Sequence, residues 1–132
     1  MRKLPTVGDH MDEVVPTLTP DTDIRAAVAF LLQHRVTGAP VVDEDGAILG
    51  IVTAFDCLRL LAEGTEAGEP VSGTVADYMT RDIQTVSPSM DIYYVAGIFL
   101  RNRFRRLPVV HEGRLVGAIT RFDILRVINS FV

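Results

Sequence analysis

Two threonine–aspartate pairs have types and spacing that could bind a ligand. One pair is Thr53 and Asp56, and the other is Thr120 and Asp123. Each follows a β-branched run and precedes a helical pattern, where Thr-x-x-acid is close to a capping box. The same carboxylate could accept bonds from two ligand hydroxyls, and a helix N-terminus favours an anion. The sequence leaves both roles open, and they can coexist.

A group of arginines stands between the two pairs. Its members are Arg101, Arg103, Arg105 and Arg106. Arg101 and Arg103 fit a solvated helix end that offsets the helix dipole. Four close guanidinium groups repel one another without an anion, so we favour a phosphate-binding role for Arg105 or Arg106. Arg121, inside the second Thr-x-x-Asp, is expected to point toward the same place.

Charge is distributed unevenly along the chain. The formal net charge is -4, which favours solubility and argues against general affinity for nucleic acid. Residues 1–68 hold 5 basic and 11 acidic groups, a net of -6, whereas residues 69–132 hold 8 basic and 6 acidic groups, a net of +2. We therefore disfavour a nucleic-acid surface on the arginines, although their local charge alone would allow one.

The polar pairs belong to a longer internal repeat. The pattern Asp-x-Met at Asp9–Met11 returns at Asp77–Met79, and the residues of Pro40–Val42 return as Pro108–Val110, both 68 positions later. The two Thr-x-x-Asp sequences are 67 positions apart because one residue is lost in a turn. Each repeat is too small to bury its apolar face alone, so we expect the two to pack together.

Each repeat is predicted to run strand–helix–strand–strand–helix. The first repeat has Val15–Leu18, Asp23–Arg35, Ala39–Val42, Ile48–Thr53 and Phe55–Ala62. The second has Ile83–Val86, Asp91–Arg103, Leu107–His111, Leu115–Thr120 and Phe122–Asn129. The first long helix is expected to bury Ile24, Ala27, Val28, Leu31 and Leu32. Gly46 is expected to supply a positive φ in a hairpin turn. Residues 63–74 read as an exposed, mobile linker.

Other features exclude several classes of protein. No apolar run is long enough to span a bilayer, and the N-terminus lacks the pattern of a signal peptide. The histidines lack spaced partners for zinc, and no nucleophile–base pair is present. The single cysteine, Cys57, is expected to be buried and inert, and it fits a reducing cytosol. We expect a cytoplasmic protein that is not an enzyme.

The order D-x-M, T/S-P, helix, P-V-V, G-x-x-G-x-x-T-x-x-D resembles the CBS motif, twice. The resemblance covers residues 7–62 and 75–130. It implies an α/β fold of the α+β type, in which two βαββα repeats related by a pseudo-two-fold axis pack as one domain. It also implies a homodimer and a regulatory role. The implied ligand is AMP, ADP, ATP or S-adenosylmethionine, bound in the clefts between the motifs and read by an unidentified protein partner.

The resemblance assigns further roles residue by residue. The aspartate of each Thr-x-x-Asp would accept bonds from the ribose hydroxyls, and the threonine would approach the phosphate or ribose. Basic residues at Arg105 and Arg106 would contact phosphate. The base would contact four apolar positions: Val15, Ala39, Ile83 and Leu107. Sequence cannot separate that role from ordinary core packing.

The first repeat departs from this pattern. Thr37 and Gly38 stand where the second repeat has two arginines, and Ala54 replaces Arg121. The two sites are therefore expected to be unequal.

A second hypothesis is an interaction module that has no ligand and serves for dimerisation. Apolar residues recur at helical spacing in the last helix of each repeat: Phe55, Leu58, Leu61, Phe122, Leu125 and Ile128. They exceed what one small domain can bury, so we expect a homodimer through these helices and a contribution from the first long helices.

Overall fold

The computed structural model describes residues 4–64, 72–102 and 104–131. It divides the chain into two compact units. One, here called the central unit, is Pro16–Ile83, and the other, the composite unit, joins Met1–Val15 to Gln84–Val132. Most of the predicted linker, residues 65–71, lies outside the described residues.

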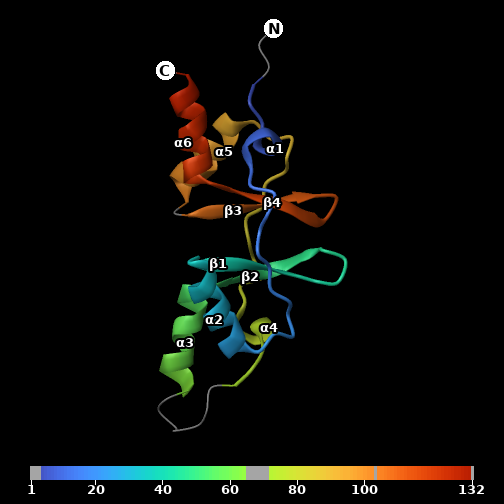
Figure 1. The fold of residues 1–132 in the computed structure, drawn as a ribbon, viewed down its shortest axis with the longest axis vertical. Helices are drawn as coiled ribbons and strands as arrows, with labels where there is room; N and C mark the ends of the chain where they lie inside the picture. The colour runs from blue at the N-terminus through green and yellow to red at the C-terminus, as the bar shows by residue number, and fades with distance from the viewer. Residues whose placement is uncertain (1–3, 65–71, 103, 132) are drawn as a thin grey trace. The chain divides into compact units, whose positions relative to one another are not determined.

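The central unit packs helices against a two-stranded antiparallel sheet. Its elements are α2 (Ile24–His34), β1 (Gly38–Val42), β2 (Ile48–Thr53), α3 (Ala54–Gly64) and α4 (Val75–Tyr78). Figure 1 shows α2, α3 and α4 on the same side of the β1–β2 hairpin. Gly46 has φ +83° in the turn of this hairpin, as predicted.

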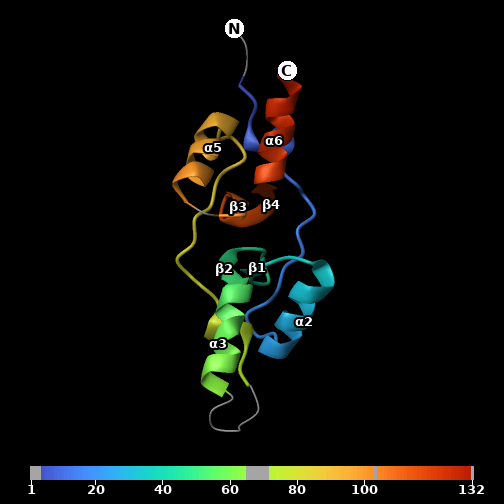
Figure 2. The same ribbon diagram turned by 90° about the vertical axis from the view of Figure 1, so that its left-hand side faces the viewer.

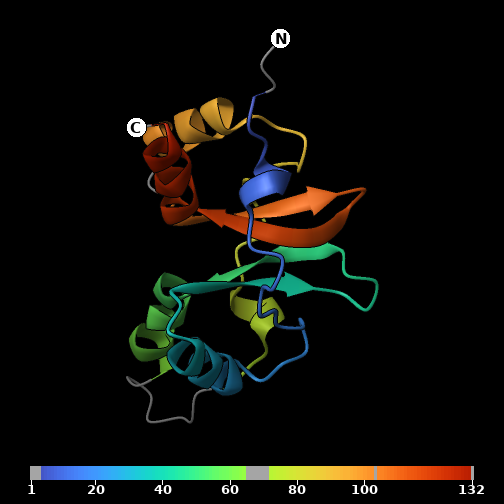
Figure 3. The same ribbon diagram turned by 45° about the horizontal axis from the view of Figure 1, so that its top comes forward.

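The composite unit repeats that arrangement. Its elements are α1 (Val7–His10), α5 (Ile92–Arg101), β3 (Arg106–His111), β4 (Arg114–Thr120) and α6 (Arg121–Ser130). Figures 2 and 3 show α5 and α6 side by side on one face of the β3–β4 hairpin. The predicted α+β fold is therefore confirmed.

The repeat seen in the sequence extends to small irregularities of the sheets. The register shifts between Val41 and Val42 in one hairpin and between Val109 and Val110 in the other, 68 positions later. Such bulges increase the local twist of a strand. Because both hairpins carry the bulge at the same place, the two units are built on one template.

The strand expected at the start of each repeat is reduced to one bridging residue. Leu18 pairs in parallel with Val41, and Val86 pairs in parallel with Val109. The prediction of full strands was wrong here. Pro16 and Pro20 flank Leu18, and proline has no N–H to continue a ladder.

Each unit takes its short helix from the other repeat. Asp12, which follows α1, exchanges backbone hydrogen bonds with Ala118 of β4. Thr80, which follows α4, exchanges the equivalent bonds with Ile51 of β2. The compact units therefore do not follow the boundaries of the sequence repeats, and neither short helix was predicted.

The long helices turn their apolar faces inward. Asp23 caps α2 by accepting from the Arg25 amide at 2.8 Å, and Ile24, Ala27 and Leu31 are buried as predicted. Val28 is half-buried. Leu32 was expected in the core and is 75% exposed, because it lies about 100° around the helix from Leu31. Among the described helices, none is both long and apolar enough to cross a membrane.

Glycine permits the close approach of the segment that follows each short helix. We call it the borrowed segment because it comes from the other repeat. A Cβ on Gly50 of β2 would lie 2.5 Å from the Thr80 carbonyl oxygen, and one on Gly117 of β4 would lie 2.7 Å from the Asp12 oxygen. Both neighbours are backbone atoms held in a bridge. Any side chain at these glycines must therefore push the borrowed segment away.

We predict that Gly50→Ala lowers the free energy of unfolding by about 1–3 kcal/mol, the usual cost of overpacking. Gly97→Ala is the matched control inside α5, where the new Cβ meets only the flexible end of Arg101. That change should stabilise the protein by about 0.5–1 kcal/mol. Urea unfolding of both variants provides the measurement. Equal effects of the same sign would contradict the close-approach argument.

Candidate functional site

Both Thr-x-x-Asp sequences form a polar turn between a strand and a helix. At the start of α6, Asp123 Oδ2 accepts from the Thr120 amide at 2.8 Å and from its hydroxyl at 3.1 Å. The Asp123 amide in turn donates to Thr120 Oγ1 at 3.3 Å. Thr53 and Asp56 repeat these three bonds at the start of α3, at 2.9, 3.0 and 3.1 Å. Both sequences therefore form reciprocal helix caps.

Capping uses only one oxygen of each carboxylate. Asp56 and Asp123 are both buried, at 9% and 8% exposure, and Oδ2 takes the two bonds from threonine in each. A carboxylate offers about four acceptor positions. The remaining capacity, mostly on Oδ1, is what a ligand hydroxyl could use.

In the central unit a hydroxyl already uses part of that capacity. Thr80 Oγ1 lies 3.1 Å from Asp56 Oδ1 and 3.3 Å from Oδ2. Thr80 is fixed by its bridge to Ile51, so its hydroxyl can move only by rotation about χ1. Sequence reasoning missed Thr80, although its position directly after D-x-M in the second repeat was available as a signal.

In the composite unit a charged group occupies the same place. Arg126 Nη1 lies 2.7 Å from Asp123 Oδ1. Asp12, the equivalent of Thr80, instead accepts from the Val14 amide through its own carboxylate. Sequence reasoning also missed Arg126, although an acid and a base three residues apart on a helix are expected to pair.

Two of the predicted arginines lie beside the Asp123 turn. Arg106 is the first residue of β3 and is paired across the sheet with Thr120. Arg121 Nε donates to the Phe104 carbonyl at 3.1 Å, which ties its side chain to the chain just before β3. Arg105 is exposed and adjacent in sequence. Within the described part of the chain, neither Arg105 nor Arg106 has a side-chain hydrogen bond or ion pair.

The central unit has no cation at these positions. Gly38 pairs with Thr53 where Arg106 pairs with Thr120. Thr37 accepts from the Ala54 amide at 2.8 Å through its backbone oxygen. The residues that make the two sites unequal in sequence therefore occupy equivalent positions in the two units of the structure. Arg101 is exposed at the end of α5, and Arg103 lies outside the described residues.

The four apolar candidates fall into two kinds. Ala39 and Leu107 are each 1% exposed and belong to the two hydrophobic cores. Val15 and Ile83 are half-buried in extended segments. Val15 belongs to the composite unit and Ile83 to the central unit. Each therefore lies with the body of the repeat to which it does not belong in sequence. A contact with a base remains a prediction for all four.

Cys57 lies beside Asp56 in α3 and is half-buried rather than fully buried as expected. Burial raises the pKa of its thiol, and the negative charge of Asp56 adds to this effect. The thiol is therefore less ionised than an ordinary cysteine at neutral pH. In the parts of the chain that the structure describes, no three His, Cys, Asp or Glu side chains are grouped to hold a metal ion.

The two polar turns and the two bulged hairpins show that one structural unit is used twice in this chain. The model of the CBS domain matches this chain twice, at residues 7–63 and 75–130. The chain therefore belongs to the CBS domain family. It is 38% identical over 124 residues to the uncharacterized protein MJ1225 of Methanocaldococcus jannaschii, covering 94% of this chain and 43% of that protein. The chain thus spans less than half of that relative.

Solved structures with the same fold carry adenosine compounds. CBSX2 of Arabidopsis thaliana, solved in complex with AMP, is 32% identical with a TM-score of 0.83, covering 96% of this chain and 98% of that chain. The CBS domain pair of protein MJ0100, solved with 5′-methylthioadenosine and S-adenosyl-L-methionine, is 27% identical with a TM-score of 0.74. That match covers 98% of this chain and 100% of the other.

We predict that Thr120→Val lowers the free energy of unfolding by about 0.5–2 kcal/mol, as expected for loss of a helix cap. The change keeps the shape of the side chain and removes both hydroxyl bonds to Asp123. Thr120→Ser keeps the hydroxyl and should stay closer to the wild type. Chemical unfolding without any ligand provides the measurement. Equal stability of the valine variant and the wild type would contradict the capping role.

Proposed function

We propose that the chain is a regulatory module whose composite unit binds an adenosine-containing ligand at the start of α6. The observation that carries the proposal is the position of Arg106. Its guanidinium group has no partner among the described residues, and it stands across the sheet from Thr120. The strand residue that carries this unpaired cation is therefore the cross-strand partner of Thr120, which caps α6 together with the buried Asp123.

This arrangement suits the two polar ends of a nucleotide. The second oxygen of Asp123 would accept hydrogen bonds from the ribose hydroxyls. Arg106 and Arg105 would bind the phosphate through charge-assisted bonds, which are about twice as strong as neutral ones. The first amides of α6 would add the favourable field of a helix N-terminus.

The charges of the candidate ligands also indicate which of them the arginines would favour. AMP, ADP and ATP bring negative charge to the arginines, whereas S-adenosylmethionine brings a positively charged sulfonium. We therefore propose a phosphorylated adenosine for the composite unit. The equivalent turn of the central unit, with Gly38 and Ala54 in place of arginines, would bind phosphate more weakly. The AMP complex of CBSX2 supports this proposal, since it shares 32% identity with this chain.

The module would act through its ligand rather than through catalysis. Ligand binding would favour one conformation over another, and a protein partner would read the difference. We propose a cytoplasmic protein that is not an enzyme. The hydroxyl and carboxylate of each turn are engaged in helix caps, which leaves them poor candidates for a nucleophile and a base.

We predict that Asp123→Ala weakens AMP binding about tenfold to a hundredfold, from the loss of hydrogen bonds to a charged group. Arg106→Ala should weaken AMP strongly and leave adenosine almost unchanged, because it removes a contact to phosphate alone. Asp56→Ala is the matched control in the central unit and should change AMP binding less. Isothermal titration with AMP, ADP, ATP, S-adenosylmethionine and adenosine gives the affinities.

Thermal melting with and without ligand separates binding from capping. A residue that only caps lowers the melting temperature without ligand and keeps the ligand-induced rise, whereas a binding residue abolishes the rise. If the wild type shows no rise with any of these ligands at millimolar concentration, the proposed function fails. The ligand-free interaction module then becomes the better reading.

The exposed faces of α3 and α6 favour assembly of two copies. Each carries three large apolar side chains that the described chain leaves in solvent. Their exposed fractions are 79% for Phe55, 60% for Leu58, 67% for Leu61, 71% for Phe122, 55% for Leu125 and 51% for Ile128. A second copy would bring an identical pair of stripes. We therefore propose a homodimer, which would serve either the ligand-binding module or the ligand-free one.

We predict that the wild type is a dimer and that the double change Leu58→Glu with Leu125→Glu yields a folded monomer. Charges at the centre of an apolar interface are costly to desolvate. Val14→Glu is the control, because Val14 is 80% exposed and lies outside both stripes. Light scattering at high micromolar concentration gives the mass. A monomeric wild type would overturn the proposal.

A further inference from the structure

Two arginines at equivalent places in the repeat make different contacts. Arg59 in α3 and Arg126 in α6 are 67 positions apart, the spacing of the two Thr-x-x-Asp sequences. Arg126 Nη1 contacts Asp123 Oδ1 at 2.7 Å. Arg59 Nη2 instead donates to the Asp77 carbonyl at 3.2 Å. Arg126 therefore pairs with the carboxylate of its own Thr-x-x-Asp turn, whereas Arg59 does not.

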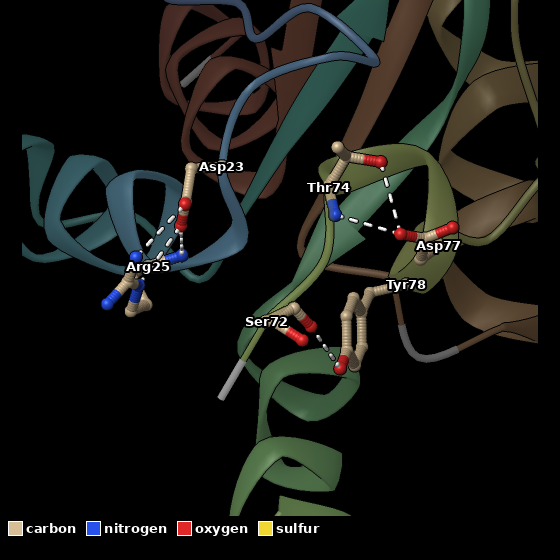
Figure 4. Close-up of polar contacts among 6 residues, drawn as sticks. All are labelled: Asp23, Arg25, Ser72, Thr74, Asp77 and Tyr78. Atoms are coloured by element: carbon tan, nitrogen blue, oxygen red, sulfur yellow. Dashed lines mark hydrogen bonds and ion pairs between the residues drawn. The ribbon is translucent and has the colours of Figure 1, made fainter. Parts of the chain in front are cut away.

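The neighbouring short helix accounts for the position of Arg59. Its guanidinium carbon lies 4.9 Å from the centre of the Tyr78 ring, within the range of a cation–π contact. Figure 4 shows how the ring is held, with the Tyr78 hydroxyl donating to the Ser72 carbonyl at 3.2 Å. Arg59 therefore has its own partners on α4, the Tyr78 ring and the Asp77 carbonyl, and it does not contact Asp56.

The composite unit has no tyrosine at the equivalent position. The equivalent of Tyr78 is His10, at the end of α1, and α1 packs on α6 in the same unit. An imidazole is a poorer surface for a cation than a phenol ring, and it repels a cation when protonated. In the composite unit the guanidinium of Arg126 pairs with Asp123 instead.

We infer that Arg126 blocks Asp123 Oδ1 when no ligand is bound, and that a ribose must displace this arginine before its hydroxyls reach Oδ1. We call Arg126 the guard residue. The inference rests on the proposed function. The side chain of Asp123 is 10% exposed, whereas that of Arg126 is 73% exposed. The carboxylate is therefore fixed in its cap, and the arginine is long, solvated and free to leave. The competition sets the affinity of the site for the sugar.

The guard and the phosphate-binding arginines are distinct groups. Arg126 contacts the carboxylate, while Arg106 lies across the sheet from Thr120. Adenosine is the right probe, since it carries the ribose without the phosphate. Adenosine binding therefore reports on the displacement of Arg126 and not on the attraction between a phosphate and the other arginines.

The direct test is isothermal titration of adenosine into the wild type and Arg126→Met. Methionine has a similar length and no donor, so Oδ1 becomes free for the ribose. An exposed ion pair contributes about 0.2–1 kcal/mol, so we expect adenosine to bind up to about fivefold more tightly. Arg59→Met is the matched control and should leave the affinity unchanged, because Arg59 does not contact Asp56.

Two further measurements use the wild-type guard. His10→Tyr places a tyrosine ring at the equivalent position, and it should draw Arg126 away and tighten adenosine binding as Arg126→Met does. Added salt screens an exposed ion pair. The wild type should therefore bind adenosine more tightly at high salt, and Arg126→Met should show less of this dependence.

The outcomes separate this inference from the proposed function. If AMP binds the wild type but Arg126→Met leaves adenosine binding unchanged or weaker, the guard is overturned and the proposed function stands. Weaker binding would mean that Arg126 holds Asp123 in position for the ligand. If no variant binds adenosine, AMP, ADP or ATP, the proposed function falls and the guard falls with it.

Discussion

A threonine and an aspartate three residues apart hold each strand to the helix that follows it. The aspartate Oδ2 takes the amide and the hydroxyl of the threonine, and the threonine oxygen takes the aspartate amide. This closed set of bonds fixes the carboxylate where the chain turns, and it leaves the second oxygen to other partners, which are Thr80 in one unit and Arg126 in the other. Capping therefore uses one oxygen of the side chain, and the ligand binding that we propose would use the other.

The same scaffold, used twice, shows what a few substitutions do around that carboxylate. Gly38 in one unit corresponds to Arg106 in the other, and Tyr78 corresponds to His10. The backbone geometry is nearly unchanged, since the bulge and the bridges recur at equivalent residues. The surroundings of the second oxygen differ completely, with a hydroxyl in one unit and a guanidinium group in the other. The two repeats thus differ in the side chains around a turn whose geometry they share.

Local patterns in the sequence predicted most of the helices and strands. The spacing of Ile24, Ala27 and Leu31 gave the buried face of α2, and the β-branched runs gave both hairpins. The pattern overstated the width of that face, which is why Leu32 was misplaced. Proline beside Leu18 reduced a predicted strand to a single bridge. Each of these errors is local, and each has a cause in the geometry of the backbone.

The remaining features depended on contacts between distant segments. The exchange of α1 and α4 between the repeats leaves no periodic signal, because four-residue helices are too short to show one. The capping role of Thr120 was readable from its spacing to Asp123. The spacing of Asp123 and Arg126 allowed them to pair but did not decide it, because Arg59 has the same spacing to Asp56 and contacts the Asp77 carbonyl instead.

The exchange of short helices also orders events during synthesis. The central unit is continuous in sequence, so all of its contacts can form once residue 83 has left the ribosome. The composite unit is different, because Asp12 pairs with Ala118, which lies 106 positions later. Such a distant pairing forms late and carries a larger loop-closure cost. The segment that contains α1 is therefore expected to be placed only after β4 and α6 have been made, because Val7 belongs to the same core as Ile124 and Val127.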